Sequence, residues 1–168
     1  AVRHLELDLA VDFAERRLTG SATLTLERRD PAAMTLHLDT RDLEIAAVHL
    51  DGASAAAPFT LAPAVPIFGQ ELGIPLAPQT RTVRIDYRTR PEAAALQWLS
   101  PEQTAGGKSP FLFTQSQAIL ARTWVPCQDS PGVRMTYDAT IRVPKELLAL
   151  MSAANPAARN ASGTYRFE

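Results

Sequence analysis

The stretch HLELDLAVDF, residues 4–13, alternates apolar and polar side chains along almost its whole length. Successive side chains of a β-strand point to opposite faces, so this period of two predicts a strand with one buried face and one solvated face. The predicted buried face carries Leu5, Leu7, Leu9, Val11 and Phe13, and the solvated face carries His4, Glu6, Asp8 and Asp12. The chain therefore opens with a half-buried strand.

The same alternation recurs through the rest of the chain. It covers residues 22–26, 34–38, 43–50, 83–88, 133–143 and 164–168, and we expect the strand at 133–143 to be the longest. Residues 15–17 would join the first two strands as an antiparallel hairpin. No long segment has the 3.6-residue period of a helix, and nearly all of the 13 prolines stand between the runs. The pattern predicts an all-β fold of mixed and antiparallel sheets, in a sandwich-like or irregular arrangement.

The composition is that of one globular domain spanning residues 1–168. The chain is 46% hydrophobic and has a formal charge of -1, which provides enough apolar material for a single core. Basic and acidic residues are interspersed and form no basic stripe, so nucleic acid is not an expected partner. No apolar run approaches the roughly 18 residues that a membrane-spanning helix needs.

Cys127 is the only cysteine, so no disulfide can form within the chain. This favours a reducing compartment, and we predict a cytoplasmic protein in which Cys127 is a buried, unreactive thiol. Export is the alternative, because a cleaved signal segment would not be part of this sequence.

One segment is not explained by strand alternation. Residues 115–119 read QSQAI, and residues 121–129 read ARTWVPCQD. Together with LQWLSPEQT at 96–104, VPKEL at 143–147 and the Ser-Ala pair at 152–153, they resemble the amino-terminal domain of the membrane-alanyl-aminopeptidase family of zinc peptidases, most closely its leukotriene A hydrolase branch. The resemblance implies a saddle-like β-domain. Over residues 1–90 it depends only on the pattern and order of strands.

The resemblance also implies a larger enzyme. Members of the family bind their zinc through a His-Glu-x-x-His helix and a further Glu, and this sequence has no such segment. We therefore interpret residues 1–168 as a truncated amino-terminal domain that is inactive alone, whose expected partner is the absent zinc-binding catalytic domain. The three histidines fall on different predicted strands, so we expect neither a metal ligand nor a catalytic residue in this chain.

Gln115 and Gln117 are the candidate substrate-binding residues. They lie two apart in a segment, 113–119, that we expect to be extended. In an extended segment both carboxamides would point to one face and could line one pocket wall. Carboxamide oxygens accept hydrogen bonds from the free α-ammonium group of a peptide. The resemblance implies that Gln117 holds this amine, that Gln115 faces the first substrate residue, and that Ala118 lies beside them. Spacing alone favours two glutamines on a solvated strand face, and the surrounding motif reverses this preference in favour of the binding site.

Other residues near this segment receive structural interpretations. Ser116, where the branch commonly has Cys, should face away from the pocket, with little functional consequence. Neither Ser116 nor Cys127 has a histidine nearby in sequence that would make it a nucleophile. Residues 126–131 are typical of a rigid turn in which Asp129 accepts hydrogen bonds from backbone amides, and the resemblance implies that this turn braces the glutamines. The GGKS at 106–109 lacks the earlier glycine of a phosphate loop and predicts a surface loop.

Two alternatives of other classes stay open. Some relatives of these peptidases have lost the zinc motif and serve as scaffolds in larger assemblies. A freestanding β-sandwich could instead bind a partner through an exposed strand edge or an apolar patch, for which LGIPL at 72–76 is a candidate. Epoxide hydrolysis, the second activity of the leukotriene hydrolase branch, cannot be inferred from this domain.

Overall fold

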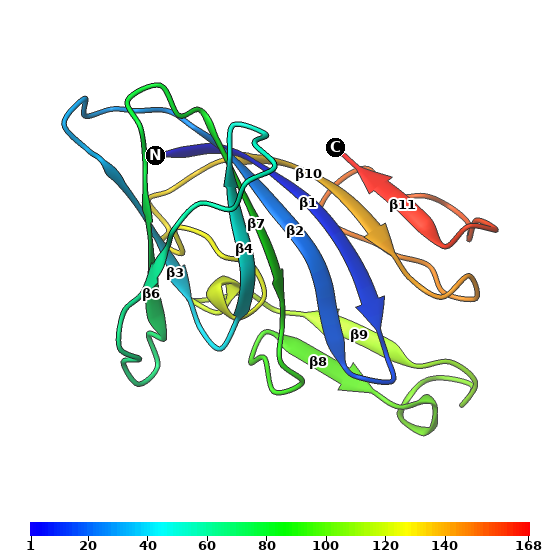
Figure 1. The fold of residues 1–168 in the computed structure, drawn as a ribbon. Helices are drawn as coiled ribbons and strands as arrows, with labels where there is room; N and C mark the ends of the chain where they lie inside the picture. Colours follow the sequence, from blue (N-terminus) through cyan, green and yellow to red (C-terminus); the bar gives the residue numbers. More distant parts are fainter.

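The computed structural model describes all 168 residues and contains strands and two single 3-10 turns, with no α-helix (Figure 1). The strands are β1 (Val2–Asp12), β2 (Arg17–Leu26), β3 (Thr35–Thr40), β4 (Glu44–Leu50), β5 (Thr60–Leu61), β6 (Gln70–Pro75), β7 (Thr82–Arg88), β8 (Leu96–Leu99), β9 (Phe111–Thr114), β10 (Thr136–Arg142) and β11 (Thr164–Phe167). The turns are η1 (Pro101–Gln103) and η2 (Ala121–Thr123). The predicted all-β class is confirmed.

The strands form three sheets. A curved six-stranded sheet has the order β11-β10-β1-β2-β7-β4, a three-stranded sheet has the order β3-β6-β5, and β8 pairs with β9 (Figure 1). The predicted hairpin of β1 and β2 is confirmed, with Leu7 opposite Ala22. On its other side β1 pairs in parallel with β10, from the far end of the chain. The large sheet is therefore mixed and the smaller ones are antiparallel, as predicted.

The apolar residues of the alternating runs form the inner face of the large sheet. Leu7 and Leu9 of β1 are buried, and so are Leu24 of β2 and Ile85 of β7. These side chains belong to one contiguous core of 25 buried residues, which also includes side chains of β3, β6 and β11. The polar side chains of β1 lie on the opposite face, where Asp8 pairs with Arg142 of β10.

Two strand predictions were wrong. The strand expected at 133–143 begins only at Thr136, because its pairing with β1 starts at His4 opposite Thr136. The longest strand is instead β1, with 11 residues. The short strands β5, β6, β8 and β9 were not predicted, because two to six residues give too little alternation to recognise. The single helical turn expected after Pro144 is a hydrogen-bonded turn, closed by the Leu147 N–H donating to the Pro144 carbonyl.

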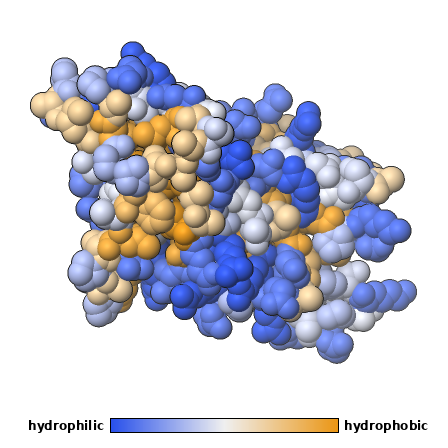
Figure 2. Space-filling view, in the orientation of Figure 1, coloured by the Kyte–Doolittle hydropathy of each residue, from blue (hydrophilic) through white to orange (hydrophobic).

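The apolar patch proposed at residues 72–76 was also wrong. Leu72 and Ile74 have no exposed surface, because β6 is the central strand of the three-stranded sheet. The exposed apolar side chains of this region lie in the loop before β6, where Ile67 is 67% and Phe68 is 57% exposed. Figure 2 shows a hydrophobic area over the part of the molecule that contains β3 and β6.

No helix of the structure is long and apolar enough to cross a membrane.

Candidate functional site

The candidate glutamines lie at the point where β9 ends. Strand pairing stops at Thr114, and residues 117–120 form a turn in which the Leu120 N–H donates to the Ser116 carbonyl at 2.9 Å. The extended segment expected at 113–119 is therefore wrong beyond its first residues. The peptide bond between Gln117 and Ala118 is cis. Gln115, Gln117 and Ala118 are all exposed.

The turn nevertheless brings the two glutamines together. The backbone N–H of Gln117 donates to Oε1 of Gln115 at 3.0 Å. Gln115 is itself anchored, because its N–H donates to the Ala95 carbonyl at 2.9 Å. The carboxamide of Gln117 has no hydrogen-bond partner within the chain and is free to bind a ligand. We refer to residues 115–120 as the glutamine turn.

Thr123 connects the glutamine turn to the neighbouring chain segment. Its buried hydroxyl accepts a hydrogen bond from the Ala95 N–H at 3.0 Å and donates one to the Leu120 carbonyl at 2.8 Å. One side chain thus holds the end of the turn against the residue that also anchors Gln115. Both ends of the glutamine turn are fixed to the segment before β8.

A buried arginine, Arg122, lies two residues after the glutamine turn in the chain. Arg122 is 5% exposed, and its Nε lies 3.0 Å from Oδ2 of Asp129, while Nη1 lies 3.2 Å from Oδ1 of Asp39. Nη1 and Nη2 also donate to the carbonyls of Phe68 and Asp129. A buried charge requires such complete pairing, because desolvation without a partner is costly. Arg122 therefore ties η2 to β3, to the loop before β6 and to the 126–131 segment.

The rigid turn predicted at 126–131 is present only in part, because Cys127 pairs with Asp39 of β3 and the chain turns only at residues 131–132. As predicted, Asp129 bonds a backbone amide, but it is that of Arg122, seven residues earlier, whose N–H donates to Asp129 Oδ2 at 3.1 Å. Cys127 is 5% exposed, and burial raises the pKa of its thiol to about 12. The predicted burial of Cys127 is confirmed, and the raised pKa favours the protonated, unreactive thiol at neutral pH.

The histidines do not assemble a metal site. His4 pairs with Asp138, His37 with Glu71 and His49 with Asp86, at three separate places. No three metal-binding side chains gather anywhere in the chain. The 106–109 segment is an exposed turn between β8 and β9 that no helix follows, so it lacks the geometry of a phosphate loop.

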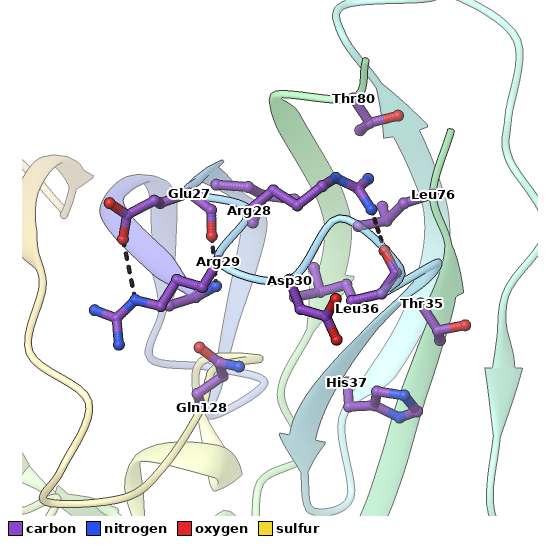
Figure 3. Close-up of a pocket in the computed structure, with 13 residues that line it drawn as sticks. Glu27, Arg28, Arg29, Asp30, Thr35, Leu36, His37, Leu76, Thr80 and Gln128 are labelled. Atoms are coloured by element: carbon purple, nitrogen blue, oxygen red, sulfur yellow. Dashed lines mark hydrogen bonds and ion pairs between the residues drawn. The ribbon is translucent and has the colours of Figure 1, made fainter. Parts of the chain in front are cut away.

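The two principal cavities lie away from the glutamine turn. The first, of about 250 Å³, is lined on one side by the Glu27–Arg29 ion pair and on another by His37 and Leu76 (Figure 3). Its Arg28 donates to the carbonyls of Ala33 and Ala77. The charged groups of this cavity are thus paired within the chain.

The second cavity, of about 280 Å³, lies beside the Phe13–Trp98 aromatic pair. Neither cavity includes a residue of the glutamine turn. Gln115 and Gln117 are exposed and line neither of these two cavities.

Comparison with known proteins identifies the family. Residues 2–168 match the Peptidase M1 N-terminal domain. The chain belongs to this family. The resemblance inferred from the motifs at 96–104 and 115–129 is thereby confirmed over residues 2–168.

Several relatives of this M1 domain are much longer proteins. The chain is 43% identical to leukotriene A-4 hydrolase of Xenopus laevis over 157 residues, which are 90% of this chain and 26% of that protein. It is 35% identical to leucine aminopeptidase 2 of Phaeosphaeria nodorum, over 98% of this chain and 28% of that protein. The M1 domain described here therefore spans about a quarter of the length of these curated relatives.

Solved structures share the fold. Yeast LTA4 hydrolase in complex with bestatin matches with a TM-score of 0.87 and 36% identity, over 99% of this chain and 26% of that chain. An M1 zinc metallopeptidase of Deinococcus radiodurans matches with a TM-score of 0.71 and 21% identity, over 99% of this chain and 38% of that chain. The second match shows the shared fold alone.

The buried polar residues next to the glutamine turn were not predicted from the sequence. Arg122 and Thr123 are buried polar residues in an otherwise largely apolar run from 118 to 127. A charged residue in such a run is a signal for a buried ion pair, because an arginine is rarely buried without partners. The partner Asp39, from β3, could not be identified from sequence, because the contact joins distant segments.

Proposed function

We propose that this domain is the amino-terminal part of a zinc aminopeptidase and that its glutamine turn binds the free amino end of peptide substrates. The observation that carries the proposal is the exposed, unpaired carboxamide of Gln117, held on a braced turn in a domain of the M1 family. Relatives of this domain include a leukotriene A-4 hydrolase and a leucine aminopeptidase.

The chemistry of the turn suits an ammonium ligand. Oε1 of Gln117 can accept one N–H of the α-ammonium group. Oε1 of Gln115 accepts the Gln117 N–H and has a second lone pair for the same ligand. Ala118 has no polar side chain and would leave room beside the first substrate residue. In this mechanism Gln117 anchors the amine, and Gln115 and Ala118 shape the space around the first residue.

The reaction itself would take place on residues outside this chain. The chain contains no set of side chains suited to a metal ion, so zinc belongs to the catalytic domain of the proposed parent enzyme. Zinc bound there would supply an activated water for attack on the first peptide carbonyl. The contribution of this chain is to fix the amino end of the peptide, which places that carbonyl at a constant distance.

The partner that we propose for the open face of the turn is this catalytic domain. Two exposed apolar side chains belong to segments that adjoin this region. Phe113 is two residues before Gln115, and Phe68 belongs to the loop before β6, where its carbonyl accepts a hydrogen bond from Arg122. A docked catalytic domain would cover these rings and provide the second wall of the pocket.

A cytoplasmic location is also part of the proposal. It is supported by the single free cysteine, which is buried and has no disulfide partner. Fractionation of cells that express the full-length protein would test it, and recovery of the protein only from the medium would contradict it.

The experiment that tests the function uses the full-length polypeptide that contains this domain. Hydrolysis of an aminoacyl chromogenic amide should be abolished by a zinc chelator and restored by zinc. Gln117→Ala should lower kcat/KM about ten- to a hundredfold, because a hydrogen bond to a charged group contributes roughly 1.5–3 kcal/mol.

Gln79→Ala is the matched control, because Gln79 is exposed and its side chain has no hydrogen-bond partner. Unchanged kinetics in Gln117→Ala would rule out the amine anchor. A full-length protein with neither bound zinc nor hydrolytic activity would instead favour the scaffold function.

A further inference from the structure

Ser116 makes one hydrogen bond through its side chain and one through its backbone. It stands between the two glutamines in the glutamine turn. Its Oγ accepts a hydrogen bond from Nε1 of Trp124 at 3.0 Å, and its carbonyl accepts the Leu120 N–H at 2.9 Å. Gln115 and Gln117 are exposed, whereas Ser116 is half-buried. Ser116 is thus the residue of this part of the turn whose side chain bonds to a partly buried aromatic residue, in addition to the backbone contact of Gln115 with Ala95.

Trp124 is well placed to hold Ser116. It follows η2 directly, and its N–H donates to the Ala121 carbonyl at 3.0 Å. Its ring is partly buried and packs against the hydrophobic core. The next residue, Val125, is buried. The indole therefore has a fixed position relative to the sheets, and a hydrogen bond to it gives Ser116 the same fixed position.

We propose that the Trp124–Ser116 hydrogen bond fixes the orientation of the glutamine turn and so positions Gln115 and Gln117 for substrate. Ser116 is joined to Gln115 and Gln117 by its two peptide bonds, so a rotation about its backbone moves one carboxamide relative to the other. Thr123 fixes the far end of the turn through the Leu120 carbonyl, and the Gln115 N–H is bound to the Ala95 carbonyl, but neither contact involves Ser116 or Gln117. Ser116 and Trp124 are positioning residues, and their role in substrate binding rests on the proposed function.

The size of the effect follows from the strength of one hydrogen bond. The net contribution of a neutral hydrogen bond corresponds to roughly a two- to tenfold change in an equilibrium constant. Loss of the bond should therefore lower the ratio of the correctly oriented turn to its other orientations by about this factor, and the apparent affinity by at most this factor. Since Gln117 would contact the amine before and during the reaction, most of the effect should appear in KM and little in kcat.

Hydrogen exchange in the full-length polypeptide tests the positioning without reference to activity. Ser116→Ala removes the acceptor and Trp124→Phe removes the donor while keeping an aromatic ring. Both should speed the exchange of the Leu120 and Gln117 amides about two- to tenfold. Ser54→Ala is the control, because Ser54 is exposed and its hydroxyl has no hydrogen-bond partner. Its exchange rates should equal those of the unsubstituted protein.

Kinetics with an aminoacyl amide then tests the consequence for binding. Each single variant should raise KM by up to about tenfold, and the double variant should be no worse than either single one, because both remove the same bond. If Ser116→Ala does not fold, Trp124→Phe alone tests the bond, because it removes the donor and leaves Ser116 in place.

The outcomes separate this proposal from the proposed function. Unchanged exchange in Trp124→Phe, or additive effects in the double variant, would overturn the positioning role even if Gln117→Ala is inactive. A fall in kcat and in melting temperature with KM unchanged would also overturn it, because that is the result of a merely structural contact. Faster exchange in both single variants, combined with normal kinetics in Gln117→Ala, would confirm the hydrogen bond as the positioning contact and remove the amine-binding function.

Discussion

Replacement of Arg122 by Met should be the most informative test of how the glutamine turn is supported. Met has a similar length but no charge, so Asp129 and Asp39 would lose their shared cation. Breaking a buried ion pair by removing one partner costs roughly 3–5 kcal/mol of unfolding free energy. Asp39 has a side chain that is 41% exposed and can be solvated, so we expect a loss near the lower limit, about 3 kcal/mol.

This loss can be measured by denaturation of the 168-residue chain. For a protein of this size each kcal/mol lowers the melting temperature by about 2–4 °C, so Arg122→Met should lower it by about 6–12 °C. Urea unfolding should give the same loss from the shift in midpoint at constant m. Arg134→Met is the matched control, because Arg134 is exposed and makes no ion pair, and it should change stability by less than about 0.5 kcal/mol. Equal stability of the Arg122→Met and Arg134→Met variants would refute the reasoning.

Two further predictions concern titratable groups. Hydrogen bonds from Arg142 lower the pKa of Asp8, and the backbone amides of Arg81 and Thr82 lower the pKa of Asp51. The stability that these carboxylates add is complete above their unfolded value of about 3.9 and is lost as pH falls through their lower folded values. The urea concentration at the unfolding midpoint should therefore decrease as the pH falls below about 4. The decrease should be smaller in a variant that carries both Asp8→Asn and Asp51→Asn. Because burial raises the pKa of Cys127 to about 12, iodoacetamide at neutral pH should label it only in denaturant, and rapid labelling of the native protein would contradict its burial.

The strands that could be predicted from sequence are those with long alternation and a solvated face. The first strand shows five apolar residues at a period of two, and the structure buries its Leu7 and Leu9 as predicted. Strand β6 was not predicted, because Leu72, Gly73 and Ile74 are buried in succession, so the strand has no alternation of buried and solvated residues at its centre. The pairing order also could not be predicted, since the parallel contact of β1 with β10 joins opposite ends of the chain.

The glutamine turn shows a different limit of sequence reasoning. Spacing of two residues predicted that Gln115 and Gln117 share a face, on the assumption of an extended backbone. The backbone instead turns after Thr114, and the two glutamines are brought together by the hydrogen bond from the Gln117 N–H to the Gln115 carboxamide. The residues were found by motif resemblance, whereas the geometry that joins them depends on local hydrogen bonds that periodicity does not describe.

The pattern of hydrogen bonding around this turn argues for a binding surface. Beneath the turn, Arg122, Thr123 and Trp124 are all paired, so each desolvated donor has its acceptor. At the surface of the turn, the carboxamide of Gln117 has no hydrogen-bond partner within the chain. A rigid support under an unpaired polar group lowers the entropy that the group loses when a ligand orders it. An unsupported surface glutamine would lose rotamer and backbone freedom on binding, and this cost would offset much of a single hydrogen bond. The buried framework is therefore what would allow one neutral carboxamide to recognise a small ammonium group.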